Sequence, residues 1–176
     1  MFCLCSVFLK KNVLQSSKVK VRFNLLLAVD INVGVVAYQI YRENTTADVF
    51  TAFIRDRVLP VLAPGVERIF LWDNLAAHFT ENKAIGLIKN AGHLVVSRPS
   101  YSPDMAPIES AFSKMKYLMR RNHDVISSNN FAEAIDLAVR EITSEDCAGW
   151  FQDCHYFVPG KSYKPYLGCA LDKSFQ

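Results

Sequence analysis

The stretch that decides the fold is Arg68-Ile-Phe-Leu-Trp72-Asp73-Asn74, a short apolar run that ends in two polar residues. Pro64 and Gly65 precede it, and such turn-forming residues typically bound a strand. Its aromatic and β-branched residues predict a buried strand, because the run is too short for a helix. Ligands of open α/β sheets gather beyond the carboxyl ends of strands. Asp73 therefore lies where a cation can bind, although a turn hydrogen bond is the simpler role for it.

The segments before this strand predict an antiparallel hairpin and a helix. Residues 18–29 alternate between polar and apolar and then become continuously apolar, which is typical of a buried strand. Residues 35–41 are β-branched and aromatic, and the turn residues between Asp30 and Gly34 connect the two strands. The sequence Thr45-Thr-Ala-Asp48 matches a capping box, so a helix is expected to begin there.

The segments after Asp73 predict further helices and one more strand. In chain order they are a helix capped by Thr80 and ended at Gly92, a strand at 93–96, an extended loop containing Pro99, Pro103 and Pro107, a helix from Ile108, a helix over 131–142 capped by Asn130, and a short helix with a tail over 147–176. Strands that alternate with helices predict an α/β fold, a mixed sheet flanked by helices.

Size and composition indicate one ordinary globular domain. The chain has 176 residues, of which 51% are hydrophobic and 21% charged, so it can bury a core and is not disordered. No apolar run reaches the length of a transmembrane helix. Met1–Leu9 is apolar but comes before Lys10 and Lys11, the reverse of the order in a secretory signal. The five scattered cysteines favour a reduced, intracellular protein.

The net charge of +3 is too small for a nucleic-acid footprint that covers the whole domain. It is also uneven, because residues 1–29 contain five basic residues and no acidic one. A claim of nucleic-acid binding must therefore rest on a site.

Glu109 is the second candidate for such a site. It lies in the first turn of the helix that follows Ser102-Pro-Asp104-Met-Ala-Pro-Ile108, and its simple role is a carboxylate stabilised by the helix N-terminus. Asp104 is most simply an N-cap or turn residue. Asp73 and Glu109 have 35 residues between them and can converge on one hard cation. Mg²⁺ is typically bound by one or two carboxylates, substrate phosphates and water.

Two quoted segments carry a family resemblance. Trp72-Asp73-Asn74-Leu-Ala-Ala-His78, followed by Tyr101-Ser-Pro-Asp-Met-Ala-Pro-Ile-Glu109, closely resembles the DDE superfamily transposases of the mariner-like group. The resemblance runs from about Val19 to about Arg121. It implies a ribonuclease H-like fold, with Asp73 as the second catalytic aspartate and Glu109 as the third carboxylate, both binding Mg²⁺ or Mn²⁺. It also implies DNA, as transposon ends and target, as the partner of a DNA cleavage and strand-transfer reaction, and it leaves a homo-oligomer open.

This sequence departs from the family at the first catalytic aspartate, which belongs on the first strand. No acidic residue precedes Asp30. Asp30 is a poor substitute, because it follows the second strand, which runs antiparallel to the first and ends about 15 Å from the carboxyl end of the strand before Asp73. Residues 1–9, or those after them, are expected to take the first-strand position. The family's DNA-binding helices are also missing, which indicates a truncated copy or a replaced start.

The expected organisation is an atypical segment at 1–17, a ribonuclease H-like transposase domain at 18–146 and an aromatic tail at 147–176 packed on that domain. The expected function is a DDE transposase endonuclease domain that lacks one catalytic residue. The alternative is a catalytically inactive remnant that at most binds DNA or a partner subunit, so enzymatic activity stays open. The expected location is intracellular, and nuclear in a eukaryote.

Other residues have simpler interpretations. His78 orients the Asp73 loop, contacts DNA or makes a local hydrogen bond. The basic residues of the Glu109 helix form a solvated face or meet phosphates: Lys114, Lys116, Arg120 and Arg121. Cys147, Cys154 and His155 lack a recognised zinc spacing. The aromatic residues of the C-terminal segment are expected in the core: Trp150, Phe151, Tyr156 and Phe157.

Overall fold

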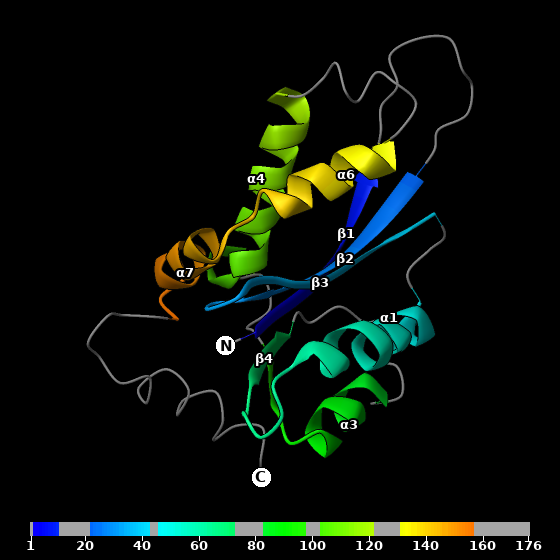
Figure 1. The fold of residues 1–176 in the computed structure, drawn as a ribbon, viewed down its shortest axis with the longest axis vertical. Coiled ribbons are helices and arrows are strands. Elements are labelled where there is room, and N and C mark those ends of the chain that lie inside the picture. Colours follow the sequence, from blue (N-terminus) through cyan, green and yellow to red (C-terminus); the bar gives the residue numbers. More distant parts are fainter. Residues whose placement is uncertain are drawn as a thin grey trace.

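The fold is built on a five-stranded mixed sheet with the strand order β3-β2-β1-β4-β5 (Figure 1). The computed structural model describes residues 2–10, 22–42, 46–72, 83–97, 103–121 and 131–156. The strands are β1 (Phe2–Lys10), β2 (Arg22–Asp30), β3 (Gly34–Tyr41), β4 (Ile69–Trp72) and β5 (Leu94–Ser97). β2 pairs antiparallel with β1 and β3, whereas β4 pairs parallel with β1 and β5. The predicted α/β class with a mixed sheet is confirmed.

The first strand of the chain is also the central strand of the sheet. β1 lies between β2 and β4, with Phe2 opposite Asp30 on one side and opposite Phe70 on the other. The expectation that residues 1–9 contribute the first strand is confirmed by this pairing. β1 contains no aspartate or glutamate.

Helices cover both faces of the sheet (Figure 1). One face packs against α4 (Pro107–Arg121), α6 (Phe131–Arg140) and α7 (Ser144–Asp153). The other packs against α1 (Ala47–Phe53), its π-helical continuation η1 (Ile54–Val58) and α3 (Lys83–Asn90). Two short 3₁₀ turns, η2 (Leu59–Val61) and η3 (Pro103–Met105), complete the described elements. No helix of the described segments is both long and apolar enough to cross a membrane.

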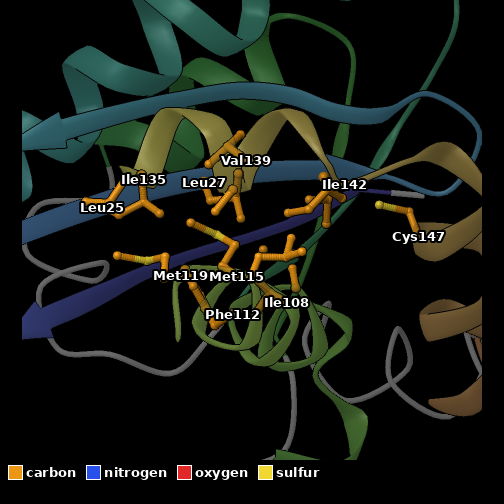
Figure 2. Close-up of a cluster of buried hydrophobic side chains, with 14 of the residues drawn as sticks. Leu25, Leu27, Ile108, Phe112, Met115, Met119, Ile135, Val139, Ile142 and Cys147 are labelled. Atoms are coloured by element: carbon orange, nitrogen blue, oxygen red, sulfur yellow. The ribbon is translucent and has the colours of Figure 1, made fainter. Parts of the chain in front are cut away.

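Successive side chains of β2 point to opposite faces of the sheet, so this strand contributes to both hydrophobic cores. Leu25 and Leu27 face the helices α4, α6 and α7, and Leu26 and Ala28 face α1 and α3; all four are fully buried. Figure 2 shows the larger core, where side chains of α4 and α6 meet those of β2. Its α4 members repeat at helical spacing, as predicted: Ile108, Ala111, Phe112, Met115, Leu118 and Met119.

Several boundaries differ from those predicted. Thr46, not Thr45, caps α1, because its hydroxyl accepts the N–H of Val49. The last helix begins at Ser144 and crosses the boundary expected between residues 146 and 147. Thr143 caps it in a capping box with Asp146, a signal that the sequence reading overlooked. The expected caps Thr80 and Asn130, and the tail beyond residue 156, lie outside the described residues.

Candidate active site

The strand β4 leads directly into Asp73. Phe70 and Leu71 of this strand are buried on opposite faces of the sheet, and the parallel pairing with β1 and β5 gives the direction in which β4 runs. β4 ends at Trp72, opposite Leu4 of β1 and Ser97 of β5. Asp73 and His78 lie outside the described residues. The predicted closeness of the Asp73 and Glu109 carboxylates therefore stays a prediction.

Glu109 lies in the first turn of α4, as predicted, and its side chain is exposed. Pro107 at the first helical position suits the fixed φ of proline, and the fully buried Ile108 anchors the turn in the core (Figure 2). The Glu109 N–H donates to the Ala106 carbonyl at 2.9 Å. Within the described segments, the carboxylate itself has no hydrogen bond or ion pair, so it is available to a ligand.

The first-strand position next to β4 carries no carboxylate. Leu4 pairs with Trp72 in two parallel strands. The next residue of β1 is Cys5, and the next residue of the chain after β4 is Asp73. Position 5 is opposite Leu27 of β2, whose side chain packs on the face covered by α4. Residues paired across antiparallel strands share a face of the sheet. A carboxylate placed at position 5 is therefore expected on the same face as α4.

Asp30 does not belong to this site. It is fully buried, and its Oδ1 accepts the N–H groups of Asn32 at 2.8 Å and Val33 at 3.1 Å. Its Oδ2 forms an ion pair with Nη1 of Arg68 at 3.1 Å. Arg68 directly precedes β4, whereas Asp73 follows it. Asp30 thus closes the amino end of β4, in agreement with the argument that it cannot replace the missing aspartate.

His93 completes this amino end, and the sequence analysis did not single it out. Its Nδ1 accepts the backbone N–H of Arg68 at 3.3 Å, and its ring lies 5.6 Å from that of Phe70. Burial lowers the pKa of His93, and the nearby Arg68 charge lowers it further. The imidazole is therefore held in its neutral form, which can accept this hydrogen bond. A histidine just before a strand gives no sequence signal for such a role.

The basic residues of α4 are not equivalent. Lys114 forms a salt bridge with Asp146 of α7, so it is occupied within the domain. Burial raises the pKa of Asp146, but the hydrogen bond from Lys114 and the backbone N–H of Thr143 outweigh it, and the net pKa is lowered. Lys116, Arg120 and Arg121 are exposed. These three, without Lys114, are the side chains of α4 that can meet phosphates.

A hydrogen bond from the C-terminal segment reaches the turn before Glu109. The hydroxyl of Tyr156 donates to the carbonyl of Met105, in η3, at 2.9 Å. Tyr156 also packs against the main core, as predicted. Its polar contact has no local sequence signal, because the two residues are 51 positions apart.

No group of three histidine, cysteine, aspartate or glutamate side chains comes together in the described part of the chain. Cys147 and Cys154 are both buried. Carboxylate oxygens, such as those of Asp73 and Glu109, suit Mg²⁺ or Mn²⁺ better than a soft metal.

Comparisons with known proteins agree with the two quoted motifs. The family model described as DDE superfamily endonuclease matches residues 10–132. No curated protein matches the chain in sequence.

Solved structures share the fold at low sequence identity. The catalytic domain of Mos1 mariner transposase is 18% identical with a TM-score of 0.54, covering 89% of this chain and 83% of that one. The Mos1 strand transfer complex is 17% identical with a TM-score of 0.54, covering 89% and 55%. A simian T-cell lymphotropic virus intasome, in complex with the PP2A regulatory subunit B56 gamma, is 11% identical with a TM-score of 0.59, covering 78% and 46%. The chain thus spans about half of the transposase chain in the strand transfer complex, and the predicted ribonuclease H-like fold is confirmed.

Proposed function

The chain belongs to the DDE superfamily endonucleases, and we propose that it is a transposase-type nuclease domain whose metal site is reduced to Asp73 and Glu109. In this proposal both carboxylates bind a divalent metal at the carboxyl end of β4. A bound Mg²⁺ or Mn²⁺ supplies the chemistry that activates water, and then a 3′-hydroxyl, for attack on a DNA phosphodiester. Both residues act by holding and orienting the ion.

The observation that carries the proposal is the exposed Glu109 carboxylate in the first turn of α4. Ile108 and Pro107 are buried beside it, so the turn is fixed while the carboxylate stays open to solvent. β4 pairs with β1 and leads into Asp73. In this proposal Asp73 and Glu109 share the metal on the side of the sheet that α4 covers. Two carboxylates with phosphate and water as further ligands are a typical Mg²⁺ site.

The missing first aspartate favours the inactive form of this site. β1 occupies the position next to β4 and has no acidic residue, and Asp30 is held by Arg68 at the other end of β4. Two carboxylates carry less negative charge than three, so Mg²⁺ binds more weakly and a second metal lacks ligands. We therefore propose a remnant that retains metal and DNA binding without efficient strand cleavage.

The names of similar structures support the choice of metal and partner. One Mos1 mariner paired-end complex, 18% identical with a TM-score of 0.50, contains Mn. Another Mos1 paired-end complex, 17% identical with a TM-score of 0.50, contains the left transposon end. For this chain we propose DNA as the partner, and in a eukaryotic cell the nucleus as the location.

The test is supercoiled-plasmid nicking with Mg²⁺ or Mn²⁺, beside an Asp73→Ala control. We expect the unmodified chain to nick no faster than the control. Metal-dependent nicking that disappears in Asp73→Ala and in Glu109→Ala would show that two carboxylates suffice, and the reduced-site proposal would be wrong.

A gain-of-function variant tests the same point from the other side. Cys5→Asp adds a carboxylate at the position expected to complete the site, and Cys5→Asn is its uncharged control. We expect tighter Mn²⁺ binding in Cys5→Asp only, measured by electron paramagnetic resonance of free Mn²⁺, and loss of that gain when Glu109→Ala is added. Equal affinities of the two Cys5 variants would contradict the assigned site.

The proposed DNA binding is weak and depends on salt. The exposed side chains of Lys116, Arg120 and Arg121 offer at most three phosphate contacts from α4. Each contact makes the slope of log affinity against log salt more negative by about 0.9. Fluorescence anisotropy with labelled duplexes in a metal chelator measures this slope. We expect similar affinities for unrelated sequences, and a strong preference for one sequence would contradict non-specific binding.

A further inference from the structure

Tyr156 lies just beyond the C-terminus of α7, two residues after its C-cap Cys154. After α7, the N–H of Tyr156 donates to the Phe151 carbonyl and the N–H of His155 to the Gln152 carbonyl, both at 2.9 Å. These two bonds define a Schellman motif, which reverses the chain at a helix end. The motif needs a left-handed residue, and His155 takes that conformation with φ +61°. Glycine is the usual residue there, so this chain accepts local strain in order to turn Tyr156 back.

The reversal places the Tyr156 side chain against both the core and the turn before Glu109. Its ring meets that of the buried Phe151 edge to face, with centroids 6.3 Å apart. A contact between these two positions commonly accompanies the Schellman motif. With the ring fixed in this way, the hydroxyl donates to the Met105 carbonyl at 2.9 Å.

Met105 immediately precedes the start of the Glu109 helix. It ends η3, Ala106 follows it, and α4 begins at Pro107. The Ala106 carbonyl in turn accepts the N–H of Glu109. The Tyr156 hydroxyl is therefore linked to the Glu109 backbone through a short rigid turn.

A second bond between α7 and α4 makes the arrangement a two-point attachment. Asp146, near the start of α7, bonds Lys114 in the middle of α4. Tyr156, beyond the end of α7, bonds the residue just before α4. Two separated contacts fix both the position and the rotation of the N-terminal half of α4, where Glu109 lies.

We propose that Tyr156 is a positioning residue for Glu109, holding the start of α4 where the carboxylate can share a metal with Asp73. The proposal rests on the metal site assigned above. Groups that orient metal ligands from outside typically change metal affinity about tenfold or more when they are removed. Tyr156 acts through the backbone and does not touch the metal.

The variant that tests this is Tyr156→Phe, which removes the hydroxyl and keeps the ring on Phe151. Tyr38→Phe is the matched control, because the Tyr38 hydroxyl also donates a hydrogen bond, to Asp136. Tyr38 lies on β3, remote from Glu109 in the sequence. Both variants lose one hydroxyl hydrogen bond. Only the first loses a bond to the turn before α4.

Two measurements separate positioning from general stability. Hydrogen exchange should become about fivefold faster at the Glu109 amide in Tyr156→Phe, the equivalent of one neutral hydrogen bond, and should not change there in Tyr38→Phe. Mn²⁺ affinity should fall about tenfold in Tyr156→Phe and stay unchanged in Tyr38→Phe.

The outcomes decide between the alternatives. Unchanged exchange at Glu109 in Tyr156→Phe would overturn the proposal, whatever happens to the metal. Faster exchange with unchanged Mn²⁺ affinity would show that the hydroxyl only stabilises the fold, which also overturns it. If the unmodified chain binds no Mn²⁺ through Asp73 and Glu109, the metal site is wrong, and the exchange rates alone then decide whether Tyr156 holds the turn.

Discussion

Asp30 and Glu109 are two carboxylates with opposite surroundings. Near the amino end of β4, Asp30 is buried, and its oxygens accept the N–H groups of Asn32 and Val33 and a hydrogen bond from Arg68. Glu109, the proposed partner of the Asp73 that follows β4 in the chain, is exposed, and the described segments give its carboxylate no partner. A carboxylate that stabilises a fold is closed off by donors, whereas one that binds a metal must keep its oxygens open. This difference predicts which substitutions cost stability and which cost ligand binding.

Asp30→Asn should cause the largest loss of stability. It leaves the mostly buried Arg68 guanidinium without its counter-charge, which typically costs about 3 kcal/mol in the free energy of unfolding. Denaturant unfolding measures this loss. Asp48→Asn is the control, because Asp48 makes an exposed ion pair with Lys83 and should change stability by less than about 0.5 kcal/mol. Equal effects of the two variants would show that burial of the Asp30–Arg68 ion pair adds nothing to stability.

Gly34→Ala tests how tightly the turn after Asp30 is packed. Gly34 has φ +87°, and an added Cβ would lie 3.1 Å from the Ser144 backbone nitrogen. We expect a loss of about 2 kcal/mol in the free energy of unfolding. Gly65→Ala is the matched control, because Gly65 has φ +74° with nothing within 4 Å. It should cost less, and an equal cost would show that the contact with α7 does not matter.

The amino end should also give the domain a pH dependence. Burial lowers the pKa of His93 in the folded state below the usual value near 6.5. The unfolded chain then binds the proton more readily, so this contribution to stability is present above pH 6.5 and is lost as the pH falls below it. Urea unfolding at pH 7.5 and pH 5 should show a smaller difference in His93→Gln than in the unmodified chain. A difference in His93→Gln as large as that in the unmodified chain would contradict the assignment.

Glu109→Gln should have the smallest effect on stability. The described segments provide the carboxylate with no partner, so the free energy of unfolding should change by less than about 0.5 kcal/mol. Mn²⁺ affinity should nevertheless fall roughly tenfold or more, because a ligand is lost. Asp104→Asn, an exposed acid in η3, is the control and should change neither quantity. A large loss of stability in Glu109→Gln would place Glu109 with Asp30 among the structural carboxylates.

Sequence patterns predicted the fold where the signal is local. The continuous apolar run before Asp30 predicted β2, because a strand buried on both faces is apolar at successive positions. The apolar spacing from Ile108 predicted the start of α4 to within one residue. The first cap was misplaced by one residue because Thr45 and Thr46 are chemically equivalent, and only the backbone decides which hydroxyl reaches a free N–H.

The candidate site was less accessible to sequence reasoning. Glu109 and Asp73 were proposed because the two motifs that contain them resemble those of the DDE transposases. Strand direction predicted that Asp30 cannot replace the missing aspartate, but its partner Arg68 is 38 positions away and had no sequence signal as a partner. Tyr156 was recognised only as an aromatic core residue, since the bond of its hydroxyl depends on how α7 packs on α4. Long-range polar contacts of this kind have no periodic signature.

The central place of β1 has a consequence for the order in which the protein is made. Phe2 is translated before its partner Phe70, which follows 68 positions later. Synthesis proceeds at about 5–20 residues per second, so the edge of β1 that pairs with β4 stays unpaired for roughly 3–14 s after β1 is made. We expect the nascent chain to bind chaperones until residue 72 emerges, because an unpaired strand edge is a template for wrong pairing. Cross-linking of stalled chains would show this binding decline once β4 has left the exit tunnel.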